Sequence, residues 1–256
     1  MPRTSNLGHQ HYTVGWICAL PKEMAAAQAT LDEKHPPLLH ERSDPNTYTL
    51  DRIGSHNVGL FSAAIVANHM RSTFKSLRVS LVVGVGGGVP SNRDIQLSDV
   101  VVGEPTGSFR RRTGSLNRPP AMLLTGVSRL KSWLSSARFE AFGHISCPGV
   151  QHDHLYQADY DRQEEGASCE NCDLEKLANR LPRDSNDPGI HYGLVASGNR
   201  ELDVICFEME AAGLMDDFSC LVIWGICDYS DSHKHKLRQG PRVTRLQRRR
   251  HILRNS

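Results

Sequence analysis

The sequence predicts a three-layer α/β domain with a largely buried central sheet. Strand-like runs alternate with helix-like runs along the chain, and several of the strand-like runs are apolar on both faces. The chain has 256 residues, of which 39% are hydrophobic and 23% charged. It can therefore form a sizeable core, as one large α/β domain or two small ones, and global disorder is not expected.

The first half of the chain predicts a strand, a helix and a hairpin in that order. YTVGWICAL (12–20) is typical of a buried strand, and Pro21 suits the first turn of a helix over 21–34. Residues 47–53 and 56–61 predict a hairpin around Gly54-Ser55. The further elements expected here are a helix over 63–74 and strands over 79–88 and 98–105.

The second half predicts fewer strands and one long irregular segment. Residues 143–189 are rich in Pro, Asp, Glu and His, which favours an irregular excursion from the domain. The regular elements expected are an amphipathic helix over 120–142, strands over 191–197 and 203–207, a helix over 208–218 and a last strand over 219–227.

The charge of the chain is concentrated at its end. The net charge is +2, but residues 241–256 hold six Arg and no acid, which leaves −4 for residues 1–240. We therefore expect no specific nucleic-acid partner and a basic, disordered tail over 241–256. The longest apolar stretches are about eight residues, far short of a membrane span, and no secretory signal is recognised near Met1.

The cysteines indicate a reducing compartment. Cys18, Cys206, Cys220 and Cys227 lie in apolar runs, where Cys acts as a small hydrophobic residue. The total of seven is odd, which does not favour a disulfide framework. We therefore expect a cytoplasmic protein without a membrane partner.

A glycine-rich stretch ends the strand expected over 79–88. GVGGGVP (84–90) lacks the Gly-Lys-Ser/Thr of a P-loop and has Val89 where a dinucleotide fingerprint needs Gly. Two interpretations stay open for this glycine loop: a tight turn, or a place where the backbone comes very close to a ligand or another strand.

Three acids are candidates for chemistry near predicted strand ends. Asp228, in CDYSD (227–231), follows a buried strand; partial desolvation there would suit it to donate a proton, although it could simply cap a turn. Glu208 and Glu210 are two apart, so on a helix they would point in different directions. One of them could accept hydrogen bonds from a vicinal diol, or both could complement a helix dipole.

A metal site is not expected. Zinc needs four ligands, usually from two paired clusters, and the chain has one CxxC motif, Cys169-Glu-Asn-Cys172. Cys147, His152 and His154 lie upstream of it, and an exposed loop is the favoured interpretation.

Several motifs in order resemble the purine and uridine phosphorylase superfamily. They are VGWICALPKEM, VVGVGGGVPSNRDIQLSDVVVGEPTG, HYGLVASGN, CFEMEAAGL and CLVIWGICDYSDSHK. More narrowly, the chain resembles fungal nucleoside phosphorylase-like domains, often the N-terminal modules of NACHT or ankyrin-repeat proteins. The resemblance implies an α/β/α sandwich with a mixed, barrel-like central sheet over 12–240, preceded by an N-terminal extension over 1–11.

The resemblance also implies a function, cleavage of the N-glycosidic bond of a purine nucleoside. Asp228 would protonate the leaving base, Met209 would pack on the ribose, and Glu210 would accept its hydroxyls. The further substrate-binding residues that it implies are Gly86, Gly87, Ser197 and Asn199. Glu208 is expected to point elsewhere. A homo-oligomer is implied, and no cofactor.

The nucleophile is either water or phosphate. Glu23 matches the glutamate with which the family's methylthioadenosine nucleosidases activate water. The glycine loop offers no convincing arginine for phosphate, and Val85 stands where phosphorylases have a hydroxyl. Hydrolysis is therefore favoured, phosphate remains the alternative co-substrate, and Glu23 could also be an ordinary solvated helix residue.

The chain departs from the family in three stretches that look short, after HNVGLF, after EPTG and after SGN. The last would remove residues that stack on the base. A second function is therefore kept open: a catalytically impaired nucleoside- or nucleotide-binding or signalling module of an NLR-like system.

Overall fold

The computed structural model describes part of the chain, in separate segments. These are residues 7–38, 48–62, 66–90, 93–104, 121–136, 153–162, 169, 172–183, 187–197, 204–208 and 220–233.

One mixed sheet dominates the described residues. Its strands are β1 (Val14–Cys18), β2 (Glu33–Lys34), β3 (Thr49–Ile53), β4 (His56–Ser62), β5 (Val79–Gly88), β6 (Val100–Gly103), β7 (Ile190–Ser197), β8 (Val204–Glu208) and β9 (Leu221–Tyr229). They are ordered β2-β3-β4-β1-β5-β8-β7-β6-β9, with parallel and antiparallel pairs. The predicted α/β class with a mixed central sheet is confirmed.

The sheet closes on itself at one end. β9 pairs with both β6 and β5, so β5, β8, β7, β6 and β9 form a ring. β5 therefore pairs with β8 and with β9 near its carboxyl end, where its glycines lie. This junction of three strands is where the candidate residues gather.

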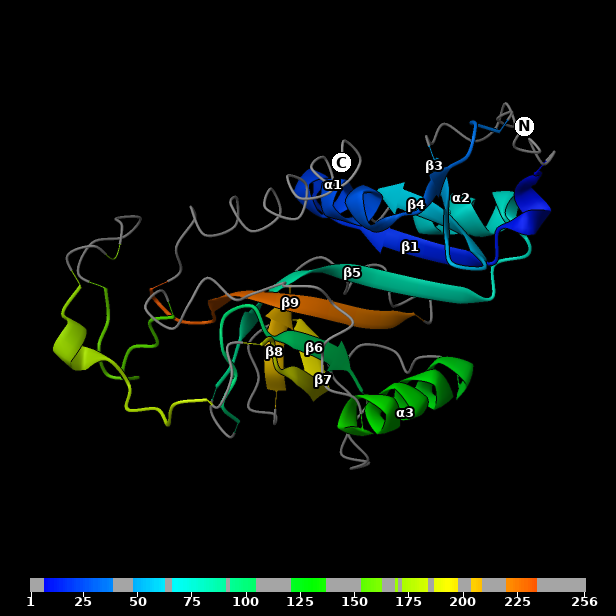
Figure 1. Cartoon of the computed structure of the whole chain (residues 1–256). Helices are drawn as coiled ribbons and strands as arrows, with labels where there is room; N and C mark the ends of the chain where they lie inside the picture. The colour runs from blue at the N-terminus through cyan, green and yellow to red at the C-terminus, as the bar shows by residue number, and fades with distance from the viewer. Residues whose placement is uncertain are drawn as a thin grey trace, which may run out of the picture.

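Among the described residues, three α-helices flank the sheet: α1 (Pro21–Thr30), α2 (Val66–Thr73) and α3 (Ala121–Ser136). Figure 1 shows α1 and α2 beside β1 and β4, and α3 at the opposite end of the molecule, near β6 and β7. Val127 of α3 packs with Val102 of β6 and Leu221 of β9. No helix in the described segments is long and apolar enough to cross a membrane.

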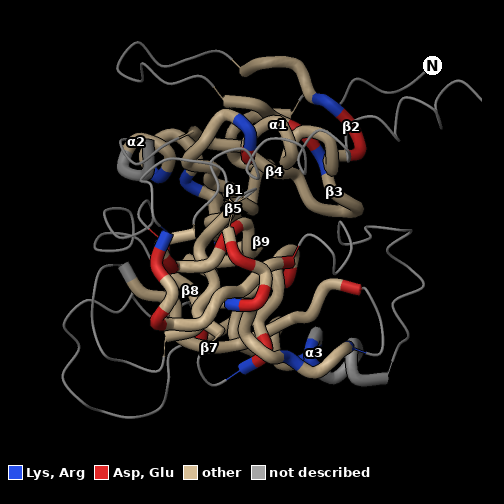
Figure 2. Tube along the Cα trace, turned by 90° about the vertical axis from the view of Figure 1, so that its left-hand side faces the viewer, with Lys and Arg blue, Asp and Glu red and all other residues tan. Residues whose placement is uncertain are grey.

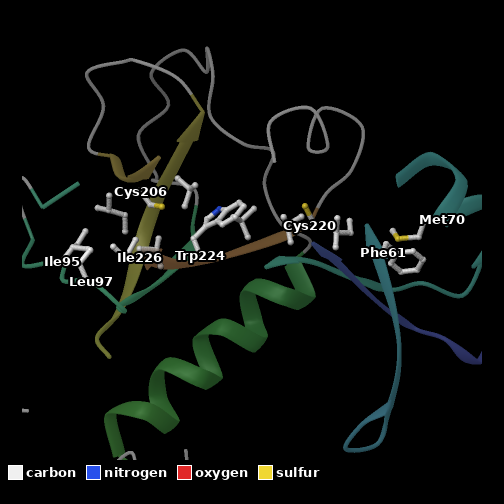
Figure 3. Close-up of a cluster of buried hydrophobic side chains, with 14 of the residues drawn as sticks. Phe61, Met70, Ile95, Leu97, Cys206, Cys220, Trp224 and Ile226 are labelled. Carbon is white, nitrogen blue, oxygen red and sulfur yellow. The ribbon is translucent and has the colours of Figure 1, made fainter. Parts of the chain in front are cut away.

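The main hydrophobic core includes buried side chains from several strands of the sheet. Trp224 and Ile226 of β9 and Cys206 of β8 are buried together, and Figure 3 shows Trp224 between Cys206 and Cys220. The four cysteines expected in apolar surroundings, Cys227 included, are buried, and none of them is in a disulfide bond. Burial raises the pKa of Cys220 to about 12, so this thiol stays protonated at neutral pH.

Most predicted elements are confirmed, with boundary changes. Gly54 has a φ of 55°, as the tight turn of the predicted hairpin requires. The helix predicted over 21–34 ends at Thr30 because Glu33–Lys34 pair with β3 instead. The described part of 143–189 holds the short 3-10 turn Leu174–Lys176 and one isolated bridge but no strand of the sheet or α-helix, so this part of the excursion is irregular as predicted.

Candidate active site

The glycine stretch is not a loop. Gly84 to Gly88 form the last part of β5, which corrects the prediction of a glycine loop after the strand. A Cβ at Gly86 would lie 2.7 Å from Cys206 Sγ and 2.9 Å from the carbonyl oxygen of Phe207. Glycine is needed because β8 and β9 both approach β5 here, so the interpretation as a close approach of another strand is confirmed.

Asp228 lies inside β9 rather than after it, opposite Gly87. Its side chain is 5% exposed, and a Cβ at Gly87 would lie 3.1 Å from its Oδ1. The thiol of Cys227 donates a hydrogen bond to its Oδ2 at 3.2 Å. The absence of a side chain at Gly87 therefore leaves room for the buried carboxyl group against β5.

Glu23 lies in the first turn of α1, where Pro21 starts the helix, and is 5% exposed. Its Oε2 accepts hydrogen bonds from the backbone N–H groups of Ala19 and Leu20, both at 2.9 Å. Its Oε1 accepts one from Val85 N of β5 at 3.0 Å. Glu23 is therefore not a solvated helix residue but a buried carboxylate with several backbone donors.

Glu23 and Asp228 meet the same strand at different points. A Cβ at Gly84 would lie 2.5 Å from Glu23 Oε1, and Asp228 lies opposite Gly87. At the usual rise of a strand, three residues separate these points by about 10 Å. The two carboxyl groups therefore approach β5 at positions three residues apart, and they do not form a pair.

Glu208 corrects a prediction. It is the last residue of β8, not the start of a helix, and it is buried at 3% exposure. Burial is the main cause of the raised pKa of Cys206, and the nearby charges of Cys227, Glu208 and Asp228 raise it further. These groups therefore lie close to Cys206. β8 extends one residue further than expected, so Glu208 is part of the sheet. A continuous apolar run such as the one before Glu208 is typical of a strand that is buried on both faces, and this pattern could have indicated the burial of Glu208.

Other predicted site residues are not all described. Met209, Glu210 and Asn199 lie outside the described residues, as do the three stretches that look short. Ser197 ends β7 and its backbone pairs with Glu208. The described residues contain no group of three or more His, Cys, Asp or Glu side chains arranged to bind a metal ion.

The sequence analysis did not predict a network of ion pairs that lies next to the end of β9. Arg180 bridges Asp94 and Asp153, and Arg183 bridges Asp94 and Asp99. Figure 2 shows charged residues of both signs around β5, β8 and β9. Because the acids and arginines lie far apart in the chain, no local spacing could have indicated these pairs.

Gly84→Ala is expected to destabilise the protein. The new Cβ would lie 2.2 Å from the Trp224 ring, which is fully buried, and close to Glu23. Overpacking of this kind costs about 1–3 kcal/mol, measurable by urea unfolding. Gly126→Ala in α3 is the control, because nothing lies within 4 Å of its Cβ. Equal stability of both variants would contradict the close approach at Gly84.

The ionisation of Asp99 should make the free energy of unfolding depend on pH in the acid range. Burial raises its pKa, but hydrogen bonds from Arg183, His191 and the backbone N–H groups of Gln96 and Gly189 outweigh this and lower the pKa from 3.8 to about 2. The ionised group therefore stabilises the fold above about pH 4, and this contribution is lost as pH falls towards 2. It amounts to roughly 2 kcal/mol.

Urea unfolding between pH 5 and pH 2 tests this expectation. Asp99→Asn should show a shallower loss of stability over that range than the wild-type chain. Identical pH dependence in the two proteins would contradict the lowered pKa.

Comparison with solved structures defines the fold. No family model matches the chain. A Borrelia burgdorferi protein assigned as a 5′-methylthioadenosine/S-adenosylhomocysteine nucleosidase, bound to adenine, has a TM-score of 0.54 at 13% identity over 95% of this chain and all of that chain. The Helicobacter pylori nucleosidase with butyl-thio-DADMe-Immucillin-A has a TM-score of 0.51 at 13% identity over 96% of this chain and 99% of its own.

The Streptococcus pneumoniae nucleosidase with a transition-state inhibitor has a TM-score of 0.50 at 17% identity over 92% of this chain and 96% of its own. The chain therefore has the nucleoside phosphorylase and nucleosidase fold.

A relative found by sequence comparison is a protein of another kind. The chain is 38% identical over 284 residues to a nucleotide-binding leucine-rich repeat (NLR)-like protein of Hyaloscypha variabilis. The match takes in 91% of this chain but only 28% of the relative, so this chain spans little more than a quarter of that protein's length.

Proposed function

We propose that the protein hydrolyses the N-glycosidic bond of a purine nucleoside. The observation that carries this proposal is the placement of two buried acids, Glu23 and Asp228, against Gly84 and Gly87 of one strand. The nucleosidase fold supports the same reaction class.

Each acid has a distinct role in this reaction. Water attacks the anomeric carbon while Glu23 accepts its proton, and the C–N bond breaks with its electrons moving to the base. Asp228 donates a proton to the departing base nitrogen. Three backbone N–H groups hold the Glu23 carboxyl group in a fixed position beside β5. We propose that Met209 and Glu210 hold the ribose.

Phosphorolysis is the less favoured route. A phosphate beside β5 would need free N–H donors and cations. Val85 N already donates to Glu23, and Arg180 and Arg183 are each engaged with carboxylates. These contacts favour water as the nucleophile.

A second candidate function is a nucleoside- or nucleotide-binding module within a larger NLR-like protein. The observation that favours it is that the match with the NLR-like relative covers only 28% of that protein. In that case the same residues would bind a nucleoside without cleaving it.

Base release by the purified chain separates these functions. Adenosine, inosine, guanosine, uridine and 5′-methylthioadenosine are incubated with the protein with and without phosphate. We expect free purine in both conditions. Release that requires phosphate would contradict hydrolysis, and tight binding without release would favour the binding module.

A further inference from the structure

The part of β9 that carries Asp228 is held on both sides of that residue. On one side, Ser98 N donates to the Ile226 carbonyl and Ile226 N donates to the Asp99 carbonyl, both at 2.8 Å. On the other side, the hydroxyl of Tyr229 accepts a hydrogen bond from Arg180 Nη1 at 2.7 Å and donates one to Asp153 Oδ1. Asp228 lies between these two attachments.

Arg180 links this strand end to two other segments. Its Nη2 lies 2.5 Å from Asp94 Oδ1 and 2.7 Å from the Ile95 carbonyl oxygen, and its Nη1 lies 3.3 Å from Asp153 Oδ2. The Tyr229 ring is buried, so its hydroxyl meets these partners away from bulk solvent. Charge-assisted hydrogen bonds in such surroundings fix geometry more strongly than ordinary ones.

The strand is irregular just before Asp228. The pairing of β9 with β5 is irregular between Gly86 and Gly87: Ile226 pairs with Gly86 and Asp228 with Gly87, which leaves Cys227 as the extra residue of a bulge. A bulge locally disrupts the ladder and changes the direction of the side chains that follow. Beyond the bulge the ladder resumes, since Tyr229 pairs with Gly88 and Ser230 N donates to the Gly88 carbonyl at 3.0 Å. The Tyr229 side chain adds a second attachment to this short paired segment.

We propose that Tyr229 and Arg180 are positioning residues that direct the Asp228 carboxyl group at the leaving base. This inference rests on the proposed function. Loss of the Tyr229 hydroxyl would let the strand end shift relative to Gly87 and weaken proton donation. Substrate binding, which other groups provide, would change little. Small misplacements of a catalytic group cost up to about 100-fold in rate.

Two substrates separate this role from a general structural one. A purine nucleoside needs its base protonated, whereas 4-nitrophenyl β-D-ribofuranoside has a leaving group that departs without protonation. In Tyr229→Phe, kcat for inosine should fall about 10- to 100-fold with KM within about a factor of two. The kcat for the nitrophenyl riboside should stay near the wild-type value. Because both rates come from one preparation, their ratio is independent of the fraction that is folded.

Tyr192→Phe is the matched control. Tyr192 lies on β7, and its buried hydroxyl has no hydrogen-bond partner among the described residues. Its removal should leave the ratio of the two rates unchanged. Arg180→Lys, which keeps the charge but loses the planar fork, should lower the ratio in the same direction as Tyr229→Phe.

The outcomes are distinct. The inference is supported if the ratio of the inosine rate to the nitrophenyl riboside rate falls in Tyr229→Phe and in Arg180→Lys but not in Tyr192→Phe. If the wild-type chain cleaves both substrates and Tyr229→Phe lowers both rates equally or neither, the inference is overturned while the proposed function stands. If the wild-type chain cleaves neither substrate, the proposed function fails, and the inference fails with it.

Discussion

Asp228→Asn is expected to lower kcat for purine base release by about 10²- to 10⁴-fold, the usual contribution of a general acid. Asparagine has nearly the same shape, so it should still fit beside Gly87, but its amide cannot supply the proton that the departing base requires. KM should change little, because the acid acts mainly as the C–N bond breaks. Base release followed by chromatography measures the effect.

Asp231→Asn is the control for this variant. Asp231 belongs to the same CDYSD motif but is exposed, and its carboxylate accepts a hydrogen bond from His233 N. This control should keep wild-type activity. Equal activity of Asp228→Asn and the wild-type chain would exclude Asp228 as the acid.

Glu23→Gln is expected to have a similar effect on hydrolysis, a loss of about 10²- to 10⁴-fold in phosphate-free buffer, because glutamine cannot accept the proton of the attacking water. The new amide would also bring an NH₂ group towards backbone N–H donors at Ala19, Leu20 or Val85. Loss of one such hydrogen bond costs about 1–3 kcal/mol, so thermal unfolding is measured alongside activity.

Glu33→Gln tests whether loss of any acid has this effect. Glu33 lies on the edge strand β2 and forms an exposed ion pair with Arg52, which contributes little. Its activity should equal that of the wild-type chain. If Glu23→Gln instead retained full phosphate-free activity, water activation by Glu23 would be wrong.

Local patterns were sufficient for much of the fold. Pro21 and the apolar run before it predicted the start of α1, and the Gly54-Ser55 turn predicted the β3–β4 hairpin. In each case the determining residues lie within a few positions of one another. The resemblance then supplied the mixed, closed sheet that periodicity alone could not specify.

The errors share a physical cause, which is pairing between distant strands. Glycine-rich stretches usually weaken strands, yet Gly84 to Gly88 remain in β5 because β8 and β9 converge on them. The same pairing extends β8 to Glu208 and buries it. The contacts of Arg180 with Asp94 and Tyr229 also depend on the folded sheet, since 86 and 49 positions separate these residues in the chain.

Asp228 and Glu23 were singled out as candidates from the sequence for different reasons. Asp228 follows a long apolar run, a general indication of a residue at a strand end, although it proved to lie within β9. Glu23 was singled out only by resemblance, because a glutamate in a helix carries no sign of burial. Its contacts with three backbone N–H groups became evident only in the structure.

The most direct test of this account is purine release from inosine and adenosine in phosphate-free buffer, measured for the wild-type chain beside Asp228→Asn. The account predicts release by the wild-type chain and a loss of at least about 100-fold in the variant. A wild-type chain that unfolds cooperatively but releases no base, or a variant that releases base at the wild-type rate, would contradict it.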